Sequence, residues 1–120
     1  MKVAYYTIMG NTKFFAEDLP FDLIELDPYT TPQKENDDFV VMIPSYGSGI
    51  VDVVADFLDF EDNKSRCKGL IGIGELSYGD DYIQDAKELA KMYDLQIIFD
   101  FENDHSQELK DKVTEIIKAL

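Results

Sequence analysis

Residues 39–51 read FVVMIPSYGSGIV and set the fold class of the chain. The first six form a continuous apolar run, which is typical of a strand buried on both faces of a parallel sheet. A glycine-bearing loop follows and leads into Val51, Val54, Ala55 and Leu58, whose spacing predicts an amphipathic helix. The stretch therefore predicts one complete strand–loop–helix unit.

The same alternation recurs on both sides of this unit. Apolar runs predict four further strands, at residues 3–7, 21–26, 69–74 and 96–101, and helical spacing predicts helices at about 12–18, 83–93 and 109–120. The run at 21–26 is the weakest and is edge-like in composition. Five strands alternating with helices predict an α/β fold, a flavodoxin-like doubly wound five-stranded parallel sheet of order 2-1-3-4-5.

Local signals mark several boundaries. Pro20 ends the first helix, Asp81 with Gln84 resembles a capping box, and Ser106 is a candidate cap for the last helix. Residues 27–38 contain two prolines and no helical period, so we expect an irregular crossover there.

The overall composition narrows the classes of function. A length of 120 residues predicts a single domain, residues 1–120. The net charge of −14, from 25 acidic and 11 basic residues, disfavours nucleic acid and suits either simple solubility or a partner with a basic surface. No apolar run approaches the roughly 20 residues of a membrane span, and no secretion signal is evident. Cys67 is the only cysteine, which is compatible with a cytoplasmic location.

Three loops are expected at one edge of the sheet, where ligands of this fold class bind. They span residues 7–12, 44–51 and 74–82 and are rich in glycine, tyrosine and hydroxyl groups. The first can be a capped turn or a phosphate cradle made of neutral donors. The other two can be flexible turns or loops that bind a flat ring. Together they favour a mononucleotide with a planar head group.

The chain resembles the NrdI family, the small flavodoxin-like proteins that serve class Ib ribonucleotide reductase. The resemblance covers nearly the whole length. It rests on the Gly-Asn-Thr turn at 10–12, on PSYGSGIV at 44–51, and on the segment from Gly69 to Glu102, which begins GLIGIGELSYGDDY. The first loop is shared with flavodoxins in general, and the last segment is the more specific.

The resemblance implies bound flavin mononucleotide (FMN). The residues that match the family's phosphate loop are Thr7, Ile8, Met9, Gly10, Asn11 and Thr12. Those that match the two ring-side loops are Ser45, Tyr46, Gly47, Ser48 and Gly49, and Gly74, Glu75, Leu76, Ser77, Tyr78 and Gly79. Tyr78 would be the stacking aromatic. The chain departs from common family patterns at Met9, Glu75 and Tyr78, where relatives often carry Thr or Ser, Asn, and Trp.

The resemblance also implies a function and partners. Reduced flavin would react with oxygen and supply a superoxide-like oxidant for assembly of the dimanganese–tyrosyl radical cofactor in the reductase small subunit. An upstream flavin or thiol-type reductant would supply electrons. The protein would act as a redox partner, with no catalytic or metal-binding side chain of its own. A general electron-transfer flavodoxin is the alternative, and a receiver-like signalling domain is a remote one.

Overall fold

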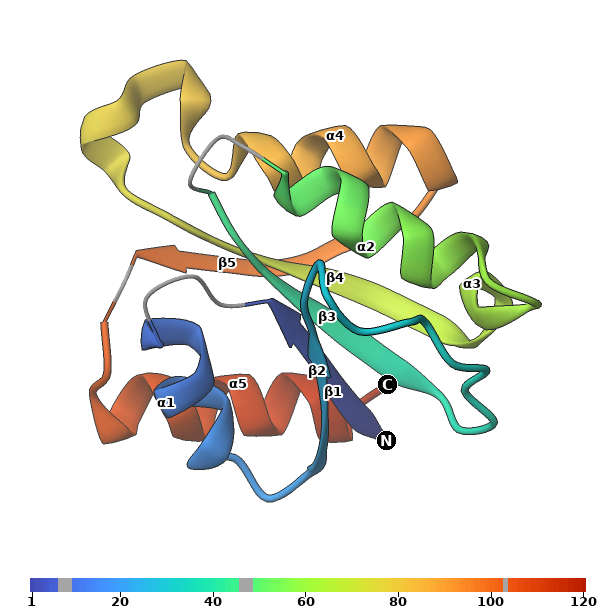
Figure 1. Ribbon diagram of the computed structural model, residues 1–120. Helices are drawn as coiled ribbons and strands as arrows, with labels where there is room; N and C mark the ends of the chain where they lie inside the picture. The colour runs from blue at the N-terminus through green and yellow to red at the C-terminus, as the bar shows by residue number, and fades with distance from the viewer. Residues whose placement is uncertain (7–9, 46–48, 103) are drawn as a thin grey trace.

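The computed structural model of the chain describes residues 1–6, 10–45, 49–102 and 104–120 (Figure 1). Its elements are, in chain order, β1 (Lys2–Tyr6), α1 (Asn11–Glu17), β2 (Asp22–Leu26), β3 (Phe39–Pro44), α2 (Ile50–Asp59), α3 (Asn63–Arg66), β4 (Cys67–Gly74), the 3₁₀ helix η1 (Leu76–Asp81), α4 (Gln84–Tyr93), β5 (Ile97–Glu102) and α5 (Gln107–Lys118).

The strands in the described part of the chain form one parallel sheet of order β2-β1-β3-β4-β5. This confirms the predicted fold class and the edge position of the strand at 21–26. Each parallel crossover carries the chain over a face of the sheet, so helices end up on both sides.

Two apolar clusters hold the three layers together. Phe39, Val41 and Ile43 of β3 pack in one cluster with α2 and α4, whereas Val40 and Met42 pack in the other with α1 and α5. Figure 1 shows the same division, with α2 and α4 on one face of the sheet and α1 and α5 on the other. All residues of β3 are buried, as its unbroken apolar run predicts.

Strand β4 begins at Cys67, two residues earlier than predicted. Cys67 is paired in register with Phe39, and its side chain is only 7% exposed. Burial raises the pKa of its thiol to about 11, so the side chain packs in its neutral form. The short helix α3 just before it was not expected from the sequence.

The two predicted helix caps have opposite outcomes. The Ser106 cap is confirmed, because Ser106 Oγ accepts a hydrogen bond from Leu109 N–H at 3.3 Å. The Asp81–Gln84 capping box is wrong: α4 starts after Ile83, and Asp81 ends η1. Ile83 is buried against Gly72, where a methyl group would lie 2.9 Å from Ile83 Cβ, so packing on β4 sets the start of α4.

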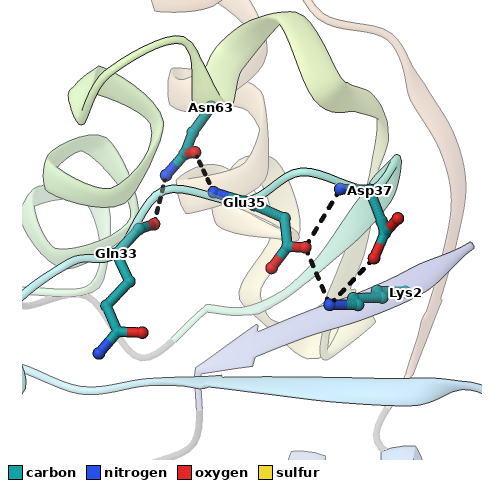
Figure 2. A network of polar contacts seen from close by, with 5 residues as sticks. All are labelled: Lys2, Gln33, Glu35, Asp37 and Asn63. Carbon is teal, nitrogen blue, oxygen red and sulfur yellow. Dashed lines mark hydrogen bonds and ion pairs between the residues drawn. The ribbon is translucent and has the colours of Figure 1, made fainter.

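The crossover at residues 27–38 is irregular, as predicted, and a polar network holds it (Figure 2). Asn63 Nδ2 donates to Gln33 O at 2.9 Å, and Asn63 Oδ1 accepts from Glu35 N–H at 2.7 Å. The carboxylate of Glu35 then pairs with Lys2 Nζ at 2.9 Å, and Asp37 pairs with the same ammonium at 3.2 Å. The crossover is thereby tied both to the start of α3 and to β1.

Within the described residues, none of the helices combines the length and the apolar character needed to span a membrane.

Candidate functional site

Three neighbouring strands end at the edge of the sheet where the three loops begin. Strand β3 lies between β1 and β4 in the sheet. Ser45 N–H donates to Ile73 O at 2.9 Å, so the carboxyl ends of β3 and β4 lie next to each other. Because all strands run in parallel, these carboxyl ends share one edge (Figure 1). The strand ends therefore meet as expected, at the switch point between β1 and β3.

The described residues cover only part of the predicted site. Predictions for Thr7, Ile8, Met9, Tyr46, Gly47 and Ser48 lie outside them, as does the prediction for the side chain of Tyr78. The described members are Gly10, Asn11 and Thr12 at the start of α1, Ser45 after β3, Gly49 before α2, Gly74 and Glu75 at the end of β4, and Leu76, Ser77 and Gly79 in η1.

The first loop leads into α1 through Gly10. Gly10 has a left-handed φ of 86° and occupies the N-cap position, so it has no side chain to accept from the first-turn amides. No acidic residue lies in that first turn. Thr12 is 2% exposed, so its hydroxyl has little surface to offer a ligand, whereas Asn11 is half-buried. Lys13 is directed toward Glu25 of β2, 3.9 Å from it.

The second loop has an orphaned polar atom at its start. Ser45 Oγ is buried and has no hydrogen-bond partner among the residues that the structure describes. At the loop's other end, Gly49 has a φ of 78°, and a methyl group added there would meet nothing within 4 Å. The loop thus combines an unsatisfied hydroxyl with open space beside a glycine.

The third loop is closed at its base and open at its tip. A methyl group at Gly74 would lie 2.9 Å from Ile83 N and 3.0 Å from Tyr82 Cδ1, so the two ends of the loop touch. At the tip, Gly79 has a φ of 62° and a methyl group would meet nothing within 4 Å. The side chain of Leu76 is 64% exposed.

Two carboxylates of β5 hold this loop, and sequence reasoning missed both. Leu76 N–H donates to Glu102 Oε1 at 2.9 Å, and Tyr82 OH donates to Asp100 Oδ1 at 3.0 Å. Burial, followed by the bond to Asp100, raises the pKa of Tyr82 to about 12, so the protonated hydroxyl that donates this bond persists to higher pH than in an ordinary tyrosine. The available signal was the position of both acids at the carboxyl end of a strand parallel to β4.

In the described parts of the chain, no group of three or more His, Cys, Asp or Glu side chains is placed to hold a metal ion. His105 lies edge-on to the ring of Phe15, with the ring centroids 6.0 Å apart. The described residues of the three loops include positive-φ glycines, open space beside Gly49 and Gly79, and a Ser45 hydroxyl with no partner among those residues.

The strand order and the loops at the switch point define a flavodoxin-like α/β protein. A sequence model of the family described as "NrdI Flavodoxin like" matches residues 3–115. The chain therefore belongs to the NrdI flavodoxin-like family.

Individual relatives agree with this assignment. The chain is 26% identical to Protein NrdI of Mesoplasma florum over an alignment of 127 residues, covering 98% of this chain and 83% of that protein. It is 26% identical to Protein NrdI of Bartonella henselae, covering 83% of this chain and 80% of that one. A putative NrdI-like protein of Streptococcus pyogenes is 27% identical, with 85% and 82% covered.

Proposed function

We propose that the chain binds FMN at the carboxyl edge of β1, β3 and β4. The observation that carries this proposal is that the described part of each of the three loops contains a positive-φ glycine, Gly10, Gly49 or Gly79, and that these loops follow neighbouring strands. Glycine in this conformation lets backbone groups approach a ligand closely. The family assignment supports a flavin as that ligand.

The described residues fit a flavin mononucleotide on three counts. An acid-free first turn makes α1 the better place for a phosphate than α2, whose first turn carries Asp52. The hydroxyl of Ser45, which has no partner among the described residues, would gain one from the bound group. No described atom lies within 4 Å of a methyl group added at Gly49 or Gly79, so a ligand could approach the backbone of both loops there.

Each loop then has a distinct task in this proposal. Residues 7–12 hold the phosphate through amides and neutral side chains, with Thr12 contributing its amide rather than its buried hydroxyl. Residues 45–49 line one side of the ring, and residues 74–79 line the other. Bound FMN would supply the redox chemistry, including reduction of oxygen to a superoxide-like oxidant. The chain's own part is to orient the ring and to leave an edge open to oxygen.

The proposed partner is the dimanganese small subunit of class Ib ribonucleotide reductase, which would use the oxidant to assemble its tyrosyl radical cofactor. A flavin or thiol-type reductant would act upstream. Two apolar side chains support docking at this edge: Phe14 in the first turns of α1 is 61% exposed, and Leu76 in the third loop is 64% exposed. We place the protein in the cytoplasm with its partner.

Titration of the chain with FMN and with riboflavin tests the cofactor assignment. FMN fluorescence should be quenched at a ratio of one to one. Riboflavin, which lacks the phosphate, should bind about tenfold more weakly or worse for each charge-assisted hydrogen bond lost. A folded chain that quenches the fluorescence of neither flavin would overturn the proposal. Equal affinities for FMN and riboflavin would show that residues 7–12 do not bind the phosphate.

A second experiment separates oxidant supply from plain electron transfer. The reduced, FMN-loaded chain is mixed with the manganese-loaded small subunit in the presence of oxygen, and the tyrosyl radical is recorded by electron paramagnetic resonance. A radical that depends on the chain supports the proposal. Absence of a radical, with rapid electron donation to unrelated acceptors, would favour the general flavodoxin alternative.

A further inference from the structure

The described side chains of the segment 75–81 are exposed. Leu76 at its start is largely exposed, and Gly79 interrupts η1 with φ 62° and ψ −124°. The segment 75–81 projects beyond the end of the sheet on the side of α4 (Figure 1). Among the described residues, the segment is held by its closed base and by polar contacts at its two ends.

Those contacts come from β5. Glu102 is paired in register with Gly74, the last residue of β4, and its carboxylate reaches Leu76 N–H at 2.9 Å. Two residues earlier on β5, Asp100 accepts the hydroxyl of Tyr82 at 3.0 Å. One carboxylate thus holds the entry of the loop and the other its exit.

The side from which Glu102 approaches the loop decides whether it can touch a ligand at the switch point. β5 is the edge strand on the far side of β4 from β3. The carboxylate of Glu102 therefore approaches the loop from the side opposite to the switch point between β1 and β3. In that position it acts on a ligand at the switch point through the loop and not by contact.

From this geometry we propose that Glu102 is a positioning residue: its hydrogen bond to Leu76 N–H fixes where the ring-side loop 75–81 stands beside the cofactor site. The part of this inference that concerns FMN rests on the proposed function. The part that concerns the loop does not, because the contact is made by the chain alone.

The test compares Glu102→Ala with Glu102→Gln. Both remove the charge, but glutamine keeps an oxygen that can accept from Leu76 N–H. Glu88→Ala, on the exposed face of α4, removes an acid away from the loop and serves as the matched control. Circular dichroism establishes that all three variants are folded.

Hydrogen exchange of the Leu76 amide is measured first, without FMN. We expect exchange to accelerate about tenfold or more in Glu102→Ala, as loss of about 1.4 kcal/mol of protection would produce. It should stay within about threefold of the parent in Glu102→Gln and in Glu88→Ala. Equal exchange in Glu102→Ala and Glu102→Gln would overturn the proposal whether or not the chain binds FMN.

FMN affinity and the midpoint potential of the bound flavin are measured next. Glu102→Ala should bind FMN several-fold more weakly than Glu102→Gln, and the two potentials should differ although the charges are equal. Identical affinities and potentials would refute the positioning role while leaving FMN binding intact. Failure of the parent chain to bind FMN would instead refute the proposed function, and the exchange result would still decide the role of Glu102 in the loop.

Discussion

Tyrosine hydroxyls tie α4 and its preceding loop to neighbouring elements. Tyr93, the last residue of α4, donates to Asp59 Oδ1 at 2.8 Å and lies 3.3 Å from Ala55 O, both on α2. Tyr82 makes the corresponding bond to Asp100 of β5. Each is a neutral donor to a carboxylate, so the ionised phenolate is disfavoured at both positions.

This arrangement predicts a loss of stability at high pH. Burial, followed by the hydrogen bond to Asp59, raises the pKa of Tyr93 from 10.0 to about 12. Between these values the unfolded chain has released the proton while the folded chain retains it, so the free energy of unfolding falls as the pH rises. Tyr93→Phe should flatten this slope in urea unfolding measured at about pH 9.5 to 11.5.

Tyr29→Phe is the matched control, since the side chain of Tyr29 is 95% exposed. It should leave the slope unchanged. A Tyr93→Phe slope equal to that of the parent would show that Tyr93 ionises at the same pH in the folded and unfolded chains.

At the scale of elements, the irregular crossover at 27–38 depends on a contact far away in sequence. The side chain of Asn63 is fully buried and satisfies Gln33 O, Phe57 O and Glu35 N–H. Apolar packing cannot replace these bonds, because unpaired backbone groups are costly to bury. One side chain therefore joins α2, α3 and the crossover.

Asn63→Ala should lower the free energy of unfolding by about 2–4 kcal/mol, because several partners lose a hydrogen bond together. Chemical denaturation checks this value. Asn36→Ala is the control: Asn36 is exposed on the same crossover and should cost less than about 0.5 kcal/mol. Equal losses in the two variants would mean that the Asn63 network contributes no net stability.

Charge dominates the molecule as a whole. A net charge of −14 on 120 residues implies self-repulsion in the compact state, which salt screens. Most ion pairs among the described residues join partly exposed side chains, as with Arg66–Asp38 at 3.5 Å. Such pairs add little stability to offset the repulsion.

Added salt should therefore stabilise the protein. Raising NaCl from about 0.05 to 0.5 M should raise the Tm by about 4 °C, the shift that about 1 kcal/mol produces at this size. Differential scanning calorimetry checks this, with an uncharged osmolyte at equal osmolality as control. A Tm that stays flat or falls with NaCl would mean that ion pairs outweigh the repulsion.

The strand order, the layers and the side of the sheet where the loops gather could be predicted before folding was considered. Apolar runs such as residues 39–44 and helical spacing predict the elements, their alternation predicts the fold class and its strand order, and crossover handedness places helices on both faces. The Ser106 cap was equally local, because the cap and its target lie three residues apart. The FMN site residues remain predictions.

The start of α4, the hydrogen bonds of Glu102 and Asp100, and the role of Asn63 depend on contacts between distant segments. Local propensity favoured Asp81 as a cap, but burial of Ile83 against β4 outweighed it. Asn63 and Gln33 are 30 residues apart, and Leu76 and Glu102 are 26 apart. Hydrogen bonds of this kind leave no periodic signal, because they form only after the sheet has brought distant segments together.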